Sequence, residues 1–149
     1  MIELVGDLFS QQCDAIAITT NGMLNKYGNG IMGAGVAKQA ATLFPNLPWL
    51  LGQSLKEHGN TTQILSNKQL RSGIEYAILS LPTKNHWRNP ADLDLIEKSL
   101  KSLVEITNLR KWNKVILPRP GCGLGGLSWQ IVKGVCETHL DDRFRIISP

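Results

Sequence analysis

The sequence has few cysteines and lacks three patterns that would each define a class of protein. Its 149 residues include only Cys13, Cys122 and Cys136, with no Cys-x-x-Cys pair, so we expect reduced thiols and a cytoplasmic protein. No run approaches the roughly 18 apolar residues of a membrane span, and no basic stretch precedes an apolar one at the start. Neither a membrane segment nor a signal peptide is therefore expected. Gly-Lys-Ser/Thr occurs nowhere, which excludes a Walker-type phosphate loop.

An excess of charge of one sign is also lacking. Sixteen Lys and Arg residues against twelve Asp and Glu residues give a formal net charge of +4, and 42% of the residues are hydrophobic. This balance excludes a disordered chain. A chain of this length is expected to form one domain over residues 1–149 with a sizeable core. The mild positive charge is compatible with an anionic partner but does not define one.

Short apolar runs alternate with helical patterns along the chain. Strands are predicted at residues 2–5, 14–19, 61–66, 74–81, 115–117 and 144–147. Helices are predicted at residues 36–44, after Asn46, from a capping Asn89 with Pro90 at the first helical position, and after Ser128. Several strands are near-continuous apolar runs, as strands buried on both faces are. The expected fold class is therefore α/β with a largely parallel sheet.

The glycines gather in two loops. Residues 28–35 (GNGIMGAG) lead into the first predicted helix, and residues 121–126 (GCGLGG) follow a predicted strand and precede Ser128. Glycines at a helix entrance let backbone N–H groups and the helix dipole face an anion. The two loops together predict a site for a phosphate-bearing ligand, whereas either loop alone also suits a tight turn.

Both loops contain Gly-x-Gly-x-x-Gly, which is also the fingerprint of dinucleotide-binding folds. That fold requires a short strand-to-helix turn and an acidic residue about 20 positions later. Here residues 21–27 separate the first loop from its strand, position 53 is Gln53, and the chain nearly ends after the second loop. The missing acidic residue therefore counts against a nicotinamide-dinucleotide enzyme, which stays an alternative hypothesis.

Lys84 is the candidate catalytic residue, because it follows the predicted strand 74–81. Ligands of open α/β sheets bind beyond the carboxyl ends of the strands, and a neutral lysine amine can attack an acetal carbon. His86 could shuttle a proton, Trp87 could stack on a base or ribose, and Arg88 adds positive charge. Lys84, His86 and Trp87 also have ordinary interpretations: a solvated charge for Lys84, a surface histidine for His86, and an aromatic that anchors the next helix for Trp87.

Three further residues are candidates for binding or catalysis. Asp7 could accept a hydrogen bond from an exocyclic amine, or be a turn aspartate, and Asn21 could bind ribose hydroxyls, or belong to an Asn-Gly turn. Cys122 lies in a glycine loop, but no histidine is near it in the sequence, so a small buried residue is favoured over a nucleophile. No Cys/His cluster has metal-ligand spacing, so no metal is expected.

Several of these segments resemble one known family. Asp14-Ala-Ile-Ala-Ile-Thr-Thr-Asn21, Gly33-Ala-Gly-Val-Ala37 and Gly121-Cys-Gly-Leu-Gly-Gly-Leu127 resemble macrodomains, the ADP-ribose-binding modules, in the family's order along nearly the whole chain. Residues 82–88 (PTKNHWR) and 117–129 (LPRPGCGLGGLSW) are most similar to one branch. That branch holds terminal ADP-ribose glycohydrolases and antitoxins that remove ADP-ribose from thymidine in DNA.

The resemblance implies a three-layer α/β/α fold with a mixed, largely parallel sheet, and a division of labour along ADP-ribose. It implies that Asp7 holds the adenine amine, that Asn21 and residues 33–36 line the distal ribose, and that residues 121–126 cradle the diphosphate. Lys84 aligns with the lysine that attacks the anomeric carbon, and His86 is a weaker candidate for proton transfer. The expected ligand-binding residues are Asp7, Leu8, Asn21, Met32, Gly33, Ala34, Gly35, Val36, Pro82, Thr83, Pro120, Gly121, Cys122, Gly123, Leu124, Gly125 and Gly126.

The sequence departs from the family pattern in three places. The usual Asn-Ala-Ala-Asn reads Ile18-Thr19-Thr20-Asn21, so the first asparagine is missing. The acid that some members carry in the second loop is replaced by Gly125, which argues against catalysis by a loop aspartate. Residues 25–30 form an insertion expected to reshape the distal-ribose end.

The leading hypothesis is therefore an ADP-ribosyl hydrolase that acts on a DNA base or a protein carboxylate, and the alternative is a non-catalytic ADP-ribose reader. ADP-ribose enters as ligand or product, and no cofactor is expected. The expected partners are ADP-ribosylated DNA or protein and a cognate ADP-ribosyltransferase toxin. Lys68, Arg71, Arg88, Arg110 and Lys111 are candidate DNA contacts, and their ordinary interpretation is a solvated surface. Membrane association is not expected, and a monomer is the simplest assembly.

Overall fold

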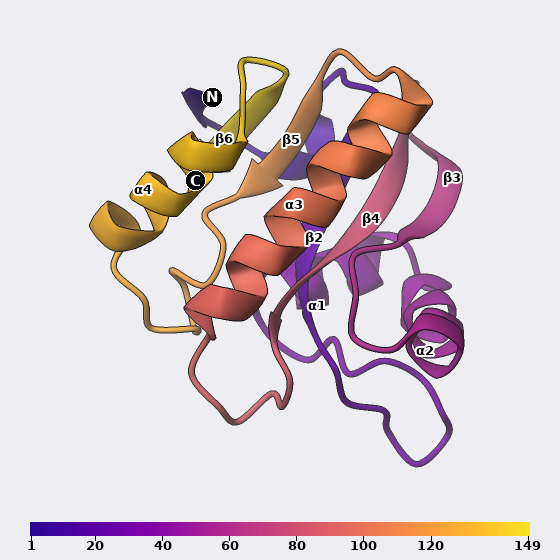
Figure 1. The fold of residues 1–149 in the computed structure, drawn as a ribbon. Helices are drawn as coiled ribbons and strands as arrows, with labels where there is room; N and C mark the ends of the chain where they lie inside the picture. The colour runs from indigo at the N-terminus through magenta and orange to yellow at the C-terminus, as the bar shows by residue number, and fades with distance from the viewer.

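The computed structural model describes all residues, Met1 to Pro149. The chain forms six strands and four α-helices, whose arrangement can be followed in Figure 1. The strands are β1 (Ile2–Val5), β2 (Ala15–Asn21), β3 (Ile64–Arg71), β4 (Ile74–Lys84), β5 (Val115–Pro118) and β6 (Phe144–Ser148). The helices are the single 3-10 turn η1 (Leu8–Ser10) and α1 (Gly35–Leu43), α2 (Leu47–His58), α3 (Leu93–Arg110) and α4 (Trp129–His139).

One mixed sheet organises the molecule, in the order β1-β6-β5-β2-β4-β3. Every neighbouring pair is parallel except β3 and β4, which form an antiparallel hairpin. The fold class is thus confirmed. Because five strands run in one direction, their carboxyl ends lie along the same edge of the sheet.

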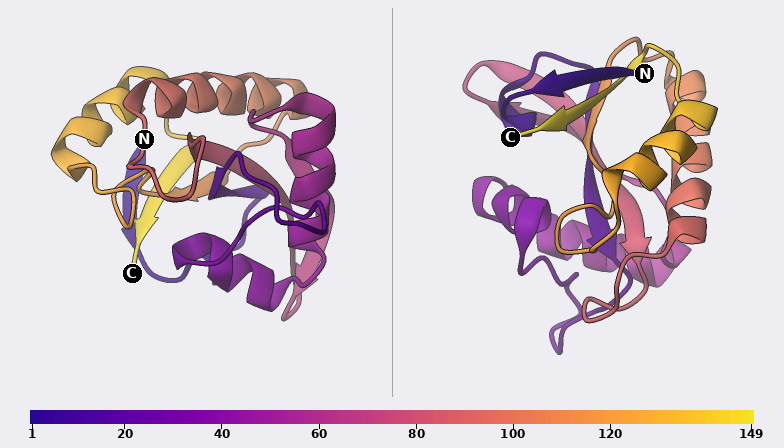
Figure 2. Two further views of the ribbon diagram at one scale, coloured as in Figure 1. Left: turned by 90° about the horizontal axis from the view of Figure 1, so that it is seen from below. Right: turned by 90° about the vertical axis from the view of Figure 1, so that its left-hand side faces the viewer.

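Two hydrophobic clusters separate the sheet from its covering helices. α3 and α4 cover one face and α1 and α2 the other, as Figure 2 shows. Successive residues of β2 alternate between the clusters: Ala15 and Ala17 pack toward α3 and α4, whereas Ile16 and Ile18 pack toward α1 and α2. All four side chains are fully buried, which explains why this strand is a continuous apolar run.

Several predicted boundaries were wrong. α3 begins after Asp92 rather than after Asn89, because the Asp92 carboxylate accepts hydrogen bonds from the N–H groups of Asp94 (2.9 Å) and Leu95 (3.3 Å). β4 continues three residues past its predicted end, to Lys84. β3 begins at residue 64 and continues to residue 71, and the 3-10 turn η1 was not predicted.

The hairpin between β3 and β4 explains the longer third strand. Ser72 and Gly73 link the two strands, and both have positive φ angles, 49° and 80°. A two-residue turn of this kind matches the right-handed twist of the strands and so extends their pairing to Arg71 and Ile74. No helix of the protein has both the length and the apolar character needed to cross a membrane.

The Asp92 cap gives a direct test of the corrected helix start. Replacing Asp92 with alanine is expected to lower the free energy of unfolding by about 1 kcal/mol, because two N–H groups of the first turn lose their acceptor. Asn89→Ala is the matched control and is expected to cost less than about 0.5 kcal/mol. Urea denaturation measures both, and equal losses would contradict the corrected start.

Candidate functional site

A single large cavity, about 1270 Å³ in volume, opens at the carboxyl edge of the sheet. Asn21 ends β2, Lys84 ends β4, Pro118 ends β5 and Ser148 ends β6, and all four line the cavity. Asn21 and Lys84 are register partners on adjacent strands, just past an irregularity between Thr20 and Asn21. The volume exceeds the roughly 300–1,000 Å³ of a drug-sized pocket, so the cavity can take an elongated ligand.

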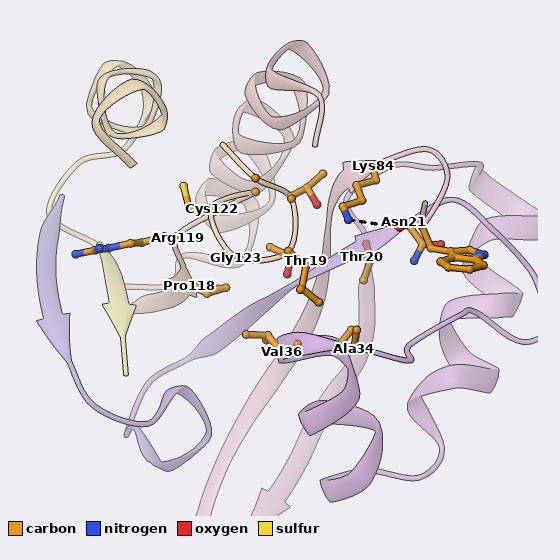
Figure 3. A pocket seen from close by; sticks show the side chains of 18 of the residues that line it. Thr19, Thr20, Asn21, Ala34, Val36, Lys84, Pro118, Arg119, Cys122 and Gly123 are labelled. Carbon is orange, nitrogen blue, oxygen red and sulfur yellow. Dashed lines mark hydrogen bonds between the residues drawn. The ribbon is translucent and has the colours of Figure 1, made fainter. Parts of the chain in front are cut away.

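The two glycine loops face each other across this cavity. In Figure 3, Ala34 and Val36 lie on one side and Cys122 and Gly123 on the other. A Cβ atom added to Gly35 would lie 3.9 Å from the side chain of Leu124, at the tip of the second loop. The first loop enters α1, and the second leads into α4 through Ser128, so both loops lie beside helix amino termini, where an anion is favoured.

Gly33 and Gly123 border open space. A Cβ atom built on either would meet no atom within 4 Å, and neither residue has a positive φ angle that requires glycine. Packing and backbone geometry therefore do not explain these two glycines. Both line the cavity, where the absence of a side chain lets a ligand approach the backbone closely.

Gly121 and Gly125 are needed for packing instead. A Cβ atom on Gly125 would lie 2.5 Å from the carbonyl oxygen of Gly121 and 2.8 Å from the Cβ of Ala91. Gly121 has φ +72°, and its added Cβ would lie 2.8 Å from Ala91 and Ile96. The second loop is thus packed against the start of α3, and an acidic side chain at position 125 requires the loop to move.

Lys84 lies at the wall of the cavity, half-buried, and its Nζ donates to the carbonyl oxygen of Trp87 at 3.5 Å (Figure 3). The backbone of Lys84 is held from the side by Asn60. The Asn60 amide donates to the carbonyl oxygen of Lys84 (2.9 Å) and to Oδ1 of Asn85 (3.0 Å). Sequence analysis missed Asn60, since nothing local marks a contact across 24 residues.

Two polar residues at the end of β2 have different hydrogen-bonding states. Asn21 is engaged on both sides of its amide: Nδ2 donates to the carbonyl oxygen of Ile31 (3.1 Å), and Oδ1 accepts from the N–H of Met23 (3.0 Å). It therefore holds the first loop in place. Thr20 lines the cavity, and its Oγ1 is buried without a hydrogen-bond partner, so this hydroxyl is available to a ligand.

The insertion at residues 25–30 packs against α2. Gly30 donates to the carbonyl oxygen of Pro48 (2.8 Å), and the Gly28 carbonyl oxygen comes so close to Gly52 that no Cβ could be accommodated there. None of residues 22–30 lines the cavity, although Ile31 does.

A charged and aromatic cluster closes the opposite end of the cavity. Arg119 lies over the Trp129 ring, 4.9 Å from its centre, and 3.7 Å from the Glu3 carboxylate. Glu3 also accepts hydrogen bonds from Lys133 (2.7 Å) and from Nε1 of Trp129 (3.0 Å). The hydrogen bonds from Lys133 first and then Trp129 lower the pKa of Glu3, so it stays anionic and fixes Arg119.

The cysteines lack the properties of a nucleophile. Burial raises the pKa of Cys122, against the opposing effect of Arg119, and its Sγ contacts the carbonyl oxygen of Pro120. Burial raises the pKa of Cys13 to about 11 and that of Cys136 to about 12. All three are free thiols, and raised pKa values leave little thiolate at neutral pH.

The cavity brings together most of the predicted residues. Those lining it are Asn21, Gly33, Ala34, Gly35, Val36, Thr83, Lys84, Gly121, Cys122, Gly123, Leu124, Gly125 and Gly126. Those outside the lining are Asp7, Leu8, Met32, Pro82, His86 and Pro120. Leu8 and Met32 are buried in the core cluster beside α1 and α2, and Pro82 and Pro120 are also buried.

Asp7 and His86 lie close to the rim. The N–H of Gly6 donates to the carbonyl oxygen of Ser148 (2.9 Å), and Ser148 lines the cavity. Asp7 therefore directly follows a residue that contacts the cavity wall. Its carboxylate caps η1 by accepting from the N–H of Phe9. His86 accepts from the N–H of Arg88 through Nδ1 (3.0 Å), which leaves Nε2 as the other nitrogen available for proton transfer.

Sequence analysis did not single out several lining residues for this role. They are Thr19, Thr20, Ile31, Ala37, Asn89, Pro90, Pro118, Arg119, Trp129, Ile147, Ser148 and Pro149. Many of them lie at or just after the carboxyl end of a parallel strand. That position predicts ligand contact for β2, β5 and β6 as much as for β4.

The fold and the site together define a class: an α/β/α domain with a large cavity between two glycine loops at the carboxyl edge of its sheet. No group of three or more His, Cys, Asp or Glu side chains is arranged to hold a metal ion. The family model described as Macro domain matches residues 24–136, and the chain belongs to this family.

The chain is similar to curated bacterial proteins. It is 32% identical over 138 residues to a DNA ADP-ribosyl glycohydrolase of Thermus aquaticus, covering 91% of this chain and 36% of that protein. It is 27% identical over 150 residues to a DNA ADP-ribosyl transferase–DNA ADP-ribosyl glycohydrolase fusion protein of Thermosipho africanus, covering 85% and 35%. The chain therefore spans about a third of the length of these relatives.

Solved structures match along the whole chain. The macrodomain of Thermus aquaticus DarG has a TM-score of 0.79 and 26% identity, covering 99% of this chain and 97% of that one. Thermosipho africanus DarTG in complex with ADP-ribose has a TM-score of 0.80 and 26% identity, covering 98% and 42%. These likenesses agree with the mixed, largely parallel sheet and its covering helices.

The packing of the second loop predicts the effect of restoring an acid there. Gly125→Asp is expected to lower the free energy of unfolding by about 1–3 kcal/mol, because the new side chain overlaps the Gly121 carbonyl and Ala91. Gly123→Asp is the control, since a Cβ at that position meets no atom within 4 Å and its φ angle is not positive. A stability unchanged in Gly125→Asp, measured by thermal unfolding, would show that the loop is not closely packed.

Proposed function

We propose that this chain binds ADP-ribose and hydrolyses the bond between an ADP-ribosyl group and a base in DNA. The observation that carries the proposal is the placement of Lys84 in the same cavity as two facing glycine loops. Membership of the macrodomain family and the printed names of the relatives support the ligand and the DNA substrate. The bond between an ADP-ribosyl group and a protein carboxylate is the alternative substrate, which a lysine could cleave by the same chemistry.

The cavity supports one orientation of the ligand. The diphosphate lies against the second loop, residues 121–126, where Gly123 leaves the backbone open and α4 begins nearby. The distal ribose lies near Lys84, and the unpaired Oγ1 of Thr20 is a hydrogen-bond partner for one of its hydroxyls. The adenine lies toward Ile147 and the rim beside Asp7.

The chemistry follows from the position of Lys84. The neutral Nζ attacks the anomeric carbon of the distal ribose, and the bond from that carbon to the base breaks. The leaving base takes the proton that Nζ loses. Water then attacks the same carbon, the bond from that carbon to Nζ breaks, and a proton of the water passes to Nζ, so that ADP-ribose is released and the lysine amine is restored. A charged Lys84 that only stabilises the departing base is the electrostatic alternative, in which water attacks directly.

The partner also follows from the relatives. The Thermosipho africanus relative joins a DNA ADP-ribosyl transferase and a DNA ADP-ribosyl glycohydrolase in one chain. This supports a cognate transferase whose modification the present chain would reverse.

Lys84 variants test the activity and separate the two mechanisms. Lys84→Ala is expected to slow release of ADP-ribose from an ADP-ribosylated oligonucleotide by about a hundredfold or more, as loss of a positioned catalytic group does. Lys84→Arg keeps the charge but not the nucleophile, so it stays inactive if the lysine attacks and recovers activity if the effect is electrostatic. Lys101→Ala, on the exposed face of α3, is the control.

The same assay separates an enzyme from a reader. If the wild-type protein releases no ADP-ribose from DNA or protein while free ADP-ribose raises its melting temperature, the hydrolase proposal fails and the reader remains. If ADP-ribose causes no thermal shift either, the binding proposal fails as well.

A further inference from the structure

Three side chains stack at the rim of the cavity directly after Lys84. The rings of His86 and Trp87 are 5.7 Å apart and inclined by 27°, and the guanidinium carbon of Arg88 lies 4.7 Å from the centre of the Trp87 ring. Trp87 and Arg88 line the cavity, and Trp87 is 46% exposed. We call these three residues the rim stack.

Core packing does not account for the rim stack. Trp87 packs against neither hydrophobic cluster, whereas Trp112 and Trp129 both pack against the cluster beside α3 and α4. Trp87 does not anchor the following helix either, because α3 begins six residues later with its own cap at Asp92. Tryptophan is enriched at binding interfaces, and Trp87 lies at the edge of the cavity, so its exposed ring is placed to contact a ligand.

Hydrogen bonds fix the rim stack to the reacting end of the cavity. The carbonyl oxygen of Trp87 accepts from Nζ of Lys84 (3.5 Å), and Nδ1 of His86 accepts from the N–H of Arg88 (3.0 Å). Asn60 holds the preceding turn through Lys84 and Asn85. A group bound on the rim stack is therefore a near neighbour of the bond that Lys84 attacks.

The chemistry of the rim stack matches a nucleotide. Flat side chains and an arginine plane bind unstacked bases, and arginine also pairs with phosphate. No acidic residue occurs between Lys84 and Ala91, and the next acid, Asp92, is occupied in capping α3. Among the basic residues named as candidate DNA contacts, only Arg88 lines the cavity. Lys68 and Arg71 lie on β3, and Arg110 and Lys111 lie at the far end of α3.

We propose that the rim stack is a subsite for the nucleotide adjacent to the modified one in a single-stranded DNA substrate. The neighbouring base stacks on the exposed part of the rim stack, and the Arg88 guanidinium holds its phosphate. The subsite rests on the proposed function, because it places a second nucleotide of the same substrate next to the bond that is cut. A protein substrate offers no base to this surface, so the subsite also selects DNA over an ADP-ribosylated carboxylate.

The test compares two substrates that share the bond but not the neighbour. One is an ADP-ribosylated single-stranded oligonucleotide, and the other is the corresponding ADP-ribosylated nucleoside. Loss of one base–aromatic stack is expected to lower the ratio of kcat/KM between oligonucleotide and nucleoside by about fivefold or more in Trp87→Ala. This substitution keeps the Trp87 carbonyl that contacts Lys84. Trp49→Ala, which removes another exposed tryptophan (56%) from α2 outside the cavity, is expected to leave the ratio unchanged.

Direct binding gives a second readout that does not need catalysis. Fluorescence anisotropy with an unmodified, labelled single-stranded oligonucleotide, in saturating ADP-ribose, is expected to show weaker binding for Trp87→Ala but not for Trp49→Ala. Arg88→Gln is expected to reduce the slope of log Kd against log salt by about 0.7, the value for one lost phosphate contact on single-stranded DNA. The Arg88→Gln variant serves as the test if Trp87→Ala does not fold.

Distinct outcomes overturn the subsite and the proposed function. If the wild-type protein cleaves both substrates and the Trp87→Ala ratio equals that of Trp49→Ala, the subsite is wrong while the hydrolase stands. If neither substrate is cleaved but rim-stack variants weaken oligonucleotide binding, the hydrolase is wrong while the DNA surface stands. Oligonucleotide binding that is unaffected by Trp87→Ala and Arg88→Gln contradicts the subsite whatever the activity.

Discussion

The parallel pairing of β2 with β4 is the interaction on which the site depends. Their register places Asn21 opposite Lys84 at the carboxyl edge of the sheet, just after an irregularity in the ladder. Asn21 then uses its amide to hold the first glycine loop, and Lys84 passes directly into the segment that carries Trp87 and Arg88. One register thus positions the loop, the candidate catalytic amine and the rim of the cavity together.

The glycines of the two loops serve separate purposes. Gly121 and Gly125 allow the second loop to pack against Ala91 at the entrance to α3, and this packing leaves no room for an acid at position 125. Gly33 and Gly123 face open space within the cavity and meet no neighbour. The first pair therefore sets the shape of the loop, and the second pair leaves backbone groups open to a ligand.

Local sequence signals predicted the parts of the site that one segment determines. The glycine loops and Lys84 were predicted, because glycine runs before helices and polar residues after strands are visible in a short window. Contacts between distant segments were not predicted: Asn60 reaches Lys84 across 24 residues, and Glu3 reaches Trp129 across 126. The predicted start of α3 was wrong because Asn89 does not cap the helix: the carboxylate of Asp92, three residues later, accepts from the first N–H groups.

If the open glycines of the two loops admit a ligand along the backbone, a larger side chain at one of them must weaken binding. Calorimetric titration of ADP-ribose into Gly123→Val tests it most directly, with Gly134→Val in α4 as the control, since neither new side chain meets an atom near its Cβ. We predict that both variants fold without steric overlap and keep free energies of unfolding within about 1 kcal/mol of the wild type. Only Gly123→Val is expected to lose affinity for ADP-ribose, by about tenfold or more. Affinity equal to that of the wild type in Gly123→Val would contradict the account.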